Sequence, residues 1–268
     1  MEKRLSWQAR GWWVRQRLGW AGAIVGPLIL SACALTVPPN RLVDYVGREA
    51  VSGPSVADLP AQRPIRTGLV LISDTSAPDA APALPDEAAN RVAETLRDEI
   101  NRITPFAIQQ ILPNDGIKPG GDPTQIAEFG RKHEVDYLAV VVLSSTEVEY
   151  PQTIFLAWTA HSQPGLRRDN WSLMEVALVD VKTGKTLIHA EGRGWATLDR
   201  PTAPGINQWY PVVWLRPSEP NWRWWPPTYE GAPNTLRVIA MNQAAKRLVL
   251  NLQGAWIERL RAERPERG

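Results

Sequence analysis

The sequence predicts an α/β (α+β) fold: a mixed sheet of about five strands with two or three packed helices, in the order β-α-β-α-β-β-α, plus a Trp/Pro-rich insertion. Three observations predict it. Apolar runs of strand length at 68–73 and 136–143 lie on either side of two stretches with helical spacing. Two further strand-like segments meet at a hairpin turn. The end of the chain repeats apolar side chains at helical spacing.

The first predicted strand begins near Ile65 and includes the apolar run 68–73, which suits burial on both faces of a sheet. A helix follows Pro85, with Asp86 as its candidate N-cap. Its apolar positions fall on one face: Val92, Leu96, Ile100 and Ile103. We expect the second strand at 105–112.

The second helix opens with a capping pattern. Asp122 fits the N-cap position, Pro123 fits the first helical position, and Gln125 fits the third position of a capping box. We expect this helix to reach about His133. The segment 136–143 that follows has the strongest strand pattern in the chain.

A hairpin and a long helix complete the predicted domain. Strands are expected at 173–181 and 186–197, joined by a turn in which Gly184 supplies the positive φ angle. The final helix is expected at 235–261. Its packing stripe consists of Leu236, Ala240, Ala244, Leu248, Leu252 and Ala255.

Two segments resemble a small α/β domain of bacterial envelope proteins. Residues 126–138 resemble a helix, a glycine and an Asp-Tyr pair that leads into a strand, here Gly130, Asp136 and Tyr137. Residues 176–187 resemble the pattern strand, Asp-x-x-Thr-Gly, strand. The domain occurs in the curli-secretion channel lipoproteins, the lipoprotein activators of penicillin-binding proteins, and the N-terminal domain of the Tol-system β-propeller protein.

The resemblance covers roughly residues 65–198 and the final helix. It implies a non-catalytic domain that binds other proteins in the periplasm. The chain departs from the pattern at 149–170 and at 199–233. Because the sequence shows no sign of channel-forming transmembrane hairpins, the resemblance does not extend to a secretion pore.

Residues 1–32 predict a lipoprotein signal peptide. Five basic side chains and one acidic side chain precede an uncharged run at 18–32, which is short for a membrane span of about 20 residues. The run ends in Leu30, Ser31 and Ala32 before Cys33, which resembles the lipobox of bacterial lipoproteins. Cys33 is the only cysteine, so we expect it to carry the lipid, and an internal disulfide is excluded.

Two alternatives stay open for this segment: an ordinary secretory signal with a chance cysteine, and an uncleaved anchor helix. The resemblance also implies delivery to the outer membrane, facing the periplasm, because Ala34 and not Asp follows the cysteine. Residues 33–64 are expected to form the lipidated cysteine and a flexible tether, with a short helix allowed around Leu42–Arg48. A single domain at 65–262 and a disordered tail at 263–268 follow.

Removal of the leader reverses the charge balance. The whole chain has 30 Lys and Arg against 28 Asp and Glu, and the leader takes five basic and one acidic residue. The mature part keeps 25 against 27, a formal net charge of −2. No basic field remains to attract nucleic acid. The expected partners are the membrane, through the lipid, and an envelope protein.

The sequence carries no recognisable metal site or catalytic motif, and no cofactor is expected. His133, His161 and His189 are too far apart in the sequence for a metal pair. Glu147 and Glu149 share one strand face but lack an opposing acid for glycoside hydrolysis.

Ser73, Asp74 and Asp79 follow the first strand, where open α/β sheets often place ligands. A solvated loop is the simpler interpretation of these three residues. Their position alone therefore predicts no ligand site.

A cluster of aromatic residues in the insertion at 199–233 is the main candidate site. It comprises Trp209, Tyr210, Trp214, Trp222, Arg223, Trp224, Trp225 and Tyr229. Three interpretations stay open: a buried satellite core, a protein-binding platform rich in typical hot-spot residues, and a surface that meets lipid headgroups.

The sequence therefore predicts a non-enzymatic, membrane-anchored periplasmic lipoprotein that binds another envelope component, expected to be a protein, in envelope assembly or maintenance. The alternative is an enzyme or binding module that acts on envelope glycan or lipid through the Trp-rich segment. Exposed tryptophan rings beside a carboxylate pair would favour the alternative.

Overall fold

The computed structural model describes residues 37–48, 51, 64–120, 122–156, 161–202, 214–216 and 231–263. The chain divides into two units between Val37 and Pro38, and the sheet belongs to the second. Its strands are β1 (Ile65–Asp74), β2 (Phe106–Leu112), β3 (Tyr137–Leu156), β4 (His161–Asp180), β5 (Thr186–Pro201) and β6 (Trp214–Arg216). The described helices are α2 (Leu42–Val46), α4 (Asp86–Ile103), α5 (Pro123–Lys132) and α6 (Ala232–Glu263).

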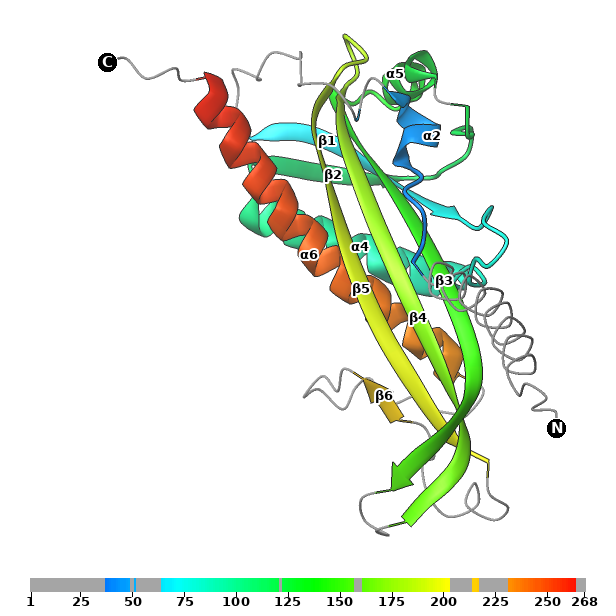
Figure 1. Cartoon of the computed structure of the whole chain (residues 1–268). Coiled ribbons are helices and arrows are strands. Elements are labelled where there is room, and N and C mark those ends of the chain that lie inside the picture. Colours follow the sequence, from blue (N-terminus) through cyan, green and yellow to red (C-terminus); the bar gives the residue numbers. More distant parts are fainter. Residues whose placement is uncertain are drawn as a thin grey trace, which may run out of the picture. The chain divides into compact units, whose positions relative to one another are not determined.

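The strands form one mixed sheet in the order β2-β1-β3-β4-β5-β6 (Figure 1). β1 pairs in parallel with β2 and with β3, and all later pairs are antiparallel. α4 and α5 make the two crossovers between parallel strands, and α6 returns along β4 and β5. The predicted α/β (α+β) class, element order and mixed sheet are confirmed, with α2 and the short β6 as additions.

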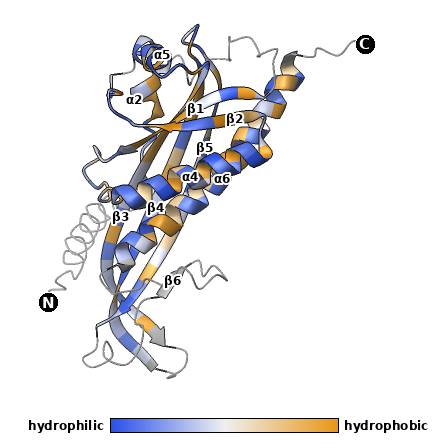
Figure 2. Ribbon diagram, turned by 180° about the vertical axis from the view of Figure 1, so that it is seen from behind, coloured by the Kyte–Doolittle hydropathy of each residue, from blue (hydrophilic) through white to orange (hydrophobic). Residues whose placement is uncertain are grey.

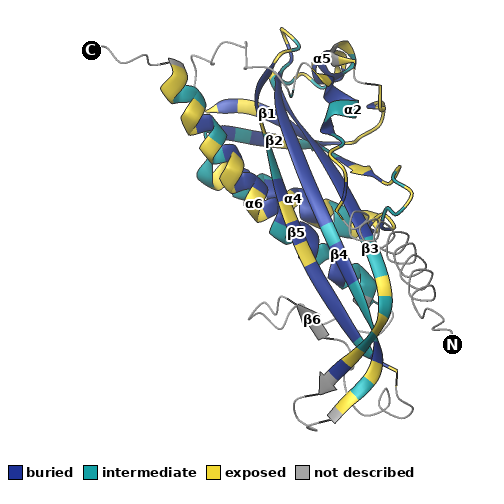
Figure 3. Cartoon of the chain, viewed as in Figure 1, coloured by how far each residue is buried: buried dark blue, intermediate teal, exposed yellow. Residues whose placement is uncertain are grey.

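Alternate side chains along the strands build two core layers on opposite faces of the sheet. The layer under α4 and α6 includes Leu69 and Val141. The layer under α2 and α5 includes their chain neighbours Val70 and Val140. Neighbouring residues thus serve opposite layers, which explains the uninterrupted apolar run at 68–73. Figure 2 and Figure 3 show apolar and buried residues concentrated on these strands.

The capping predictions are confirmed in part. The Asp122 carboxylate accepts a hydrogen bond from the Thr124 amide at 2.9 Å, as an N-cap should. Gln125 does not close the capping box, because its side-chain oxygen accepts from a loop amide 3.3 Å away. At α4 the predicted Asp86 cap is wrong: Pro85 is the N-cap and Asp86 lies in the first turn, where its charge suits the helix dipole.

β3 and β4 are each 20 residues long and extend well beyond the prediction. The predicted strands stopped at Leu143 and resumed at Leu173, because the residues between them are mainly polar. In the structure the two strands stay in register from Tyr137↔Asp180 to Leu156↔His161. Most of the departure from the envelope-domain pattern at 149–170 is therefore an extension of this hairpin.

Two glycines let α6 lie close to β5. A Cβ atom on Gly192 would lie 2.2 Å from the Ala244 carbonyl oxygen, and one on Gly194 would lie 1.9 Å from the Ala240 carbonyl oxygen. Moving the backbone of a packed helix aside for a single side chain would disrupt its packing on the sheet. Glycine at both positions is therefore a packing requirement of this helix–sheet contact.

The structure corrects the predicted tether between residues 38 and 48. The short helix α2 forms there, and Leu42, Tyr45 and Val46 are buried in the layer shared with α5. Burial of three apolar side chains stabilises docking of this segment on the sheet, so it cannot act as a flexible spacer. The leader and residues 52–63 lie outside the described residues, and the domain limits stay predictions.

Candidate interaction surface on the distal hairpin sheet

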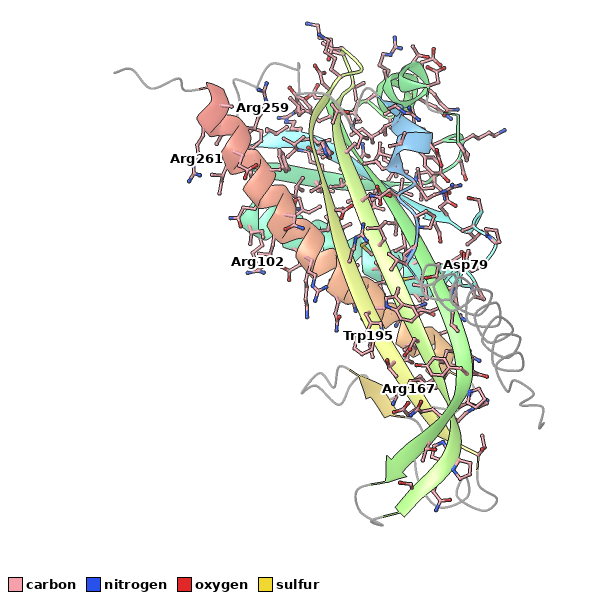
Figure 4. All side chains as sticks on the ribbon, in the orientation of Figure 1. Asp79, Arg102, Arg167, Trp195, Arg259 and Arg261 are labelled. Carbon is pink, nitrogen blue, oxygen red and sulfur yellow. The ribbon has the colours of Figure 1, made fainter. Side chains whose placement is uncertain are left out.

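The extended parts of β3, β4 and β5 form a region that we call the distal sheet, residues 145–156, 161–172 and 194–201. The first half of α6 packs on one of its faces, the helix face, which carries Ala196 and Leu198. The opposite face carries Tyr150, Trp171 and Trp195, and we call it the aromatic face. Figure 4 labels Trp195 and Arg167 on these strands.

A buried ion pair joins α6 to the helix face. The guanidinium of Arg237 donates to both carboxylate oxygens of Glu147, at 2.8 and 3.0 Å. The two side chains are only 8% and 11% exposed. Asn234 accepts a further hydrogen bond from Arg237 at 3.1 Å. Because the pair is bidentate and desolvated, it fixes both the position and the rotation of the start of α6.

The pairing continues along the helix face. Arg168 bridges Glu147 at 3.2 Å and Glu149 at 2.7 Å. Beside them, the Asn170 amide donates to the hydroxyl of Ser145 at 2.9 Å. The predicted face shared by Glu147 and Glu149 is thus present, and its partners are arginines. Each of the two carboxylates therefore has at least one arginine partner.

Carboxylates on the aromatic face are buried and also paired. Asp169 accepts from the Tyr150 hydroxyl at 2.8 Å and from the Thr197 hydroxyl at 2.5 Å. Arg167 donates to both oxygens of Asp199, at 2.7 and 3.0 Å, and this hydrogen bonding raises the pKa of Arg167. Burial and the hydrogen bond to Asp169 raise the pKa of Tyr150. The two carboxylates of the aromatic face are therefore buried and hydrogen-bonded, and they expose little negative charge to solvent.

The aromatic rings, in contrast, lie toward the surface. Trp171 and Trp195 are directly opposite each other on β4 and β5. Trp195 is 42% exposed, Trp171 and Tyr150 are half-buried, and all three project from the same face. The sequence prediction missed these residues because it placed no strand at Tyr150 or Trp171. The alternation along β5 was the signal that could have identified Trp195.

A second polar cluster holds the chain segment before α2. Glu175 accepts hydrogen bonds from the amides of Arg41 at 2.6 Å and Leu42 at 3.1 Å, and from the Asn40 side chain at 3.0 Å. Asp74 accepts from the Arg41 side chain at 3.2 Å and the Tyr45 hydroxyl at 3.0 Å. Asp74, considered above as a loop residue, is a buried structural anchor for α2.

Opposing effects set the pKa values in this cluster. Burial alone would raise the pKa of the Asp74 carboxyl, but hydrogen bonds from Ser76, Tyr45 and Arg41 outweigh it and lower the pKa. Burial and the contact with Asp74 raise the pKa of Tyr45 to about 12. Asp74 is therefore held as a carboxylate and Tyr45 as a neutral hydrogen-bond donor.

The other sequence candidates do not converge. His133 is the C-cap of α5 and its ring lies 4.5 Å from that of Phe129. His189 is exposed on β5, and Asp79 lies in a turn after β1. Among the described residues, no group of His, Cys, Asp and Glu side chains is placed to hold a metal ion.

A shallow groove of about 690 Å³ lies at the amino ends of β1 and β3. Its charged lining residues are Arg66, Arg131, Asp136, Asp180 and Lys182. The Asp180 carboxylate accepts from the Lys182 amide and the Thr183 hydroxyl of its own turn. Of the two acids in the lining, Asp180 is thus engaged by hydrogen bonds within the predicted hairpin turn.

The predicted lipidation and partner-binding residues lie outside the described residues, except for Trp214, of which the backbone is described. These are Leu30, Ser31, Ala32, Cys33, Trp209, Tyr210, Trp222, Arg223, Trp224, Trp225 and Tyr229. The backbone of Trp214 begins β6, which pairs with β5 from Thr197 to Asp199. The insertion therefore adds a strand at the edge of the distal sheet.

No protein-family model matches the chain, and no curated protein matches it. Several solved structures do match the chain. A PelC dodecamer from Paraburkholderia phytofirmans is 16% identical over 74% of this chain and 95% of that chain, with a TM-score of 0.30. A homologue of the neuraminyllactose-binding haemagglutinin from Helicobacter pylori is 9% identical over 77% and 96%, with a TM-score of 0.35.

A protein from Caulobacter crescentus that is described as a lipoprotein is 13% identical over 74% of this chain and 93% of that chain, with a TM-score of 0.29. The three envelope groups that the motifs resemble are not among these matches. At such identities and TM-scores, the matches carry no argument about function.

Proposed function

We propose that this chain is a lipoprotein of the cell envelope, anchored through Cys33, that works by binding another envelope component and not by catalysis. The anchor is supported by the lipobox-like Leu30-Ser31-Ala32-Cys33 behind a basic leader. None of the described helices carries an apolar stretch long enough to cross a bilayer. Ala34 after the cysteine favours the outer membrane, facing the periplasm.

One observation supports binding over catalysis: each carboxylate of the distal sheet already has a hydrogen-bond partner within the protein. Glu147, Glu149, Asp169 and Asp199 each have an arginine, tyrosine or threonine partner within hydrogen-bond distance. General acid–base chemistry needs a carboxyl that can exchange a proton with substrate. The alternative of an enzyme on envelope glycan or lipid has no such group in the described distal sheet.

The expected partner is a protein, met through the Trp-rich insertion. β6 fixes the backbone of that insertion to the edge of β5, beside the aromatic face. The ion pair between Arg237 and Glu147 fixes the start of α6, shortly after the insertion ends. The insertion is thus tied to the distal sheet at 214–216 and is followed by a fixed helix, which supports a lowered entropy cost of presenting its aromatic side chains to a partner.

The anchor is tested by metabolic labelling with an alkyne fatty acid. The wild-type chain should incorporate the label and fractionate with membranes, whereas Cys33→Ala should lose the label and keep its leader. A Cys33→Ala chain that is processed and membrane-bound like wild type would refute the anchor.

Partner binding is tested by crosslinked pulldown from detergent-solubilised membranes. The triple variant Trp222→Ala/Trp224→Ala/Trp225→Ala should lose a protein that the wild type recovers. Leu250→Ala/Ile257→Ala, which removes exposed apolar side chains from α6, is the matched control and should retain it. If wild type, the triple variant and the control recover all proteins equally, the Trp-rich insertion is not a protein-binding platform.

A further inference from the structure

The docked segment before α2 leaves a very short link to the anchor. Pro38 is buried, and Asn40 and Arg41 are held by Glu175, so the chain is fixed to the sheet from Pro38 onward. Only five residue steps separate Pro38 from Cys33. An extended chain spans at most about 3.6 Å per residue, so the link reaches no further than about 18 Å.

Asn40, near the start of the second unit, contacts the sheet on the side of the aromatic face. Asn40 donates to Glu191 at 2.8 Å and accepts from Arg193 at 3.4 Å, both on β5. Side chains two residues apart on a strand share a face, so Glu191, Arg193 and Trp195 project together. Trp195 lies about 7 Å along β5 from Arg193 at the usual rise per residue. The aromatic face is therefore adjacent to the anchored end.

The chemistry of this face matches that of a membrane interface. Trp and Tyr favour the headgroup level of a bilayer, where the ring is apolar and its N–H or O–H meets water. Tyr150, Trp171 and Trp195 provide three such rings on one sheet surface. The acids nearby are either buried or paired, Asp199 with Arg167 and Glu191 with Arg193 at 3.2 Å, so little free charge opposes the contact.

We propose that the aromatic face rests on the lipid headgroups of the membrane that holds Cys33. This inference depends on the proposed lipidation of that residue. The acyl chains must enter the bilayer, and a link of about 18 Å keeps the nearest sheet surface against the headgroup layer. The three aromatic side chains then fix the orientation of the domain. Because the charges on the face are paired, the contact does not require anionic lipid.

The test uses the lack of any cysteine other than Cys33. In the lipidated protein, Trp195→Cys supplies one free thiol for an environment-sensitive NBD fluorophore. Ile257→Cys on α6 is the matched control, because Ile257 is 41% exposed and Trp195 is 42% exposed. Both proteins are purified in detergent, checked for the lipid by mass spectrometry, and reconstituted into phosphatidylethanolamine/phosphatidylglycerol or phosphatidylcholine vesicles that contain lipids brominated near the headgroup.

We expect the brominated lipids to quench NBD at position 195 at least three-fold more than at position 257, in both kinds of vesicle. Equal quenching at the two positions, or stronger quenching at 257, overturns the proposal. So does crosslinking of position 195 in cells mainly to a protein, which would make the face a protein interface. A lipidated chain without preferential quenching refutes the orientation alone, whereas a chain without lipid on Cys33 refutes the anchor and the orientation together.

Discussion

The proximal and distal parts of the sheet are built by opposite means. Around β1, in the first part of β3 and in the last part of β4, apolar residues such as Leu69, Val140 and Val141 fill both faces under helices. In the distal sheet, β4 and β5 bury Asp169 and Asp199, and β3 carries Glu147, whose side chain is only 11% exposed. Apolar packing stabilises through area and tolerates many arrangements. A buried charge is tolerated only with its own partner, so the distal sheet gains specificity at some cost in stability.

The junction between the distal sheet and α6 should give the largest effect. Gly194→Ala places a Cβ atom 1.9 Å from the Ala240 carbonyl oxygen, so α6 must shift. We expect a loss of about 3 kcal/mol or more in the free energy of unfolding, measured by urea denaturation. The control is Gly254→Ala in the same helix, where a Cβ meets nothing within 4 Å. That variant should gain about 0.5–1 kcal/mol, and equal losses in both would contradict the close approach.

The ion pair between Arg237 and Glu147 should give the second-largest effect. Its single and double variants distinguish the contribution of charge pairing from that of packing. Arg237→Met removes the bidentate partner of Glu147, which is 11% exposed and keeps Arg168 at 3.2 Å as its remaining arginine partner, and we expect a loss of about 3 kcal/mol. Replacing both partners, as Arg237→Met/Glu147→Leu, should bring the unfolding free energy back to within about 1 kcal/mol of wild type, because no unpaired charge then remains. A double variant as unstable as the single one would show that the pair itself supplies net stability.

The proximal sheet should respond to lost volume. Leu69→Ala removes a fully buried side chain between α4 and the sheet, and we expect a loss of about 2–3 kcal/mol by the same denaturation measurement. Leu69→Met, which keeps the volume, should cost less than about 1.5 kcal/mol. If Leu69→Met were as damaging as Leu69→Ala, packing at this site would demand a specific shape, as pairing does in the distal sheet.

The smallest effect is expected at Asp74, where a charge anchors α2 beside the apolar layer. Its lowered pKa means that the carboxylate stabilises the fold above its ordinary pKa, and that this stability is lost as the pH falls through the lowered value. Asp74→Asn should cost about 1 kcal/mol at neutral pH and expose residues 38–48 to protease. The difference from wild type should vanish in strong acid. If the stability difference between Asp74→Asn and wild type did not depend on pH, the shape of the Asp74 side chain, and not its charge, would hold α2.

The sequence predicts the proximal half well because its signals are local. The cap at Asp122, the turn at Gly184 and the apolar run at 68–73 each depend on residues a few positions apart. The distal half was missed because its polar residues are stabilised by partners far along the chain. Glu147 meets Arg237 at a separation of 90 residues, and nothing in the local pattern marks that pair.

The same reasoning explains why the docking of α2 on the sheet was not predicted, although a short helix around Leu42–Arg48 was allowed. A five-residue helix among prolines looks like part of a linker, and the carboxylates that fix it to the sheet, Glu175 and Asp74, lie 134 and 33 residues away from Arg41. The aromatic face was missed for a similar reason. The predicted Trp-rich cluster lies almost wholly outside the described residues, whereas the aromatic face depends on cross-strand register, which the sequence does not specify until the hairpin length is known.

The position of α6 after all the described strands has a consequence for folding order. This helix contributes Met241, Leu248 and Trp256 to the largest core layer, yet it is synthesised only after the strands that it covers. Until it arrives, the long antiparallel strands carry an uncovered apolar face and open edges, which are the features that promote aggregation. The growing chain is therefore at its most vulnerable after β5 and before α6 is made, and truncation before residue 231 should give an insoluble product.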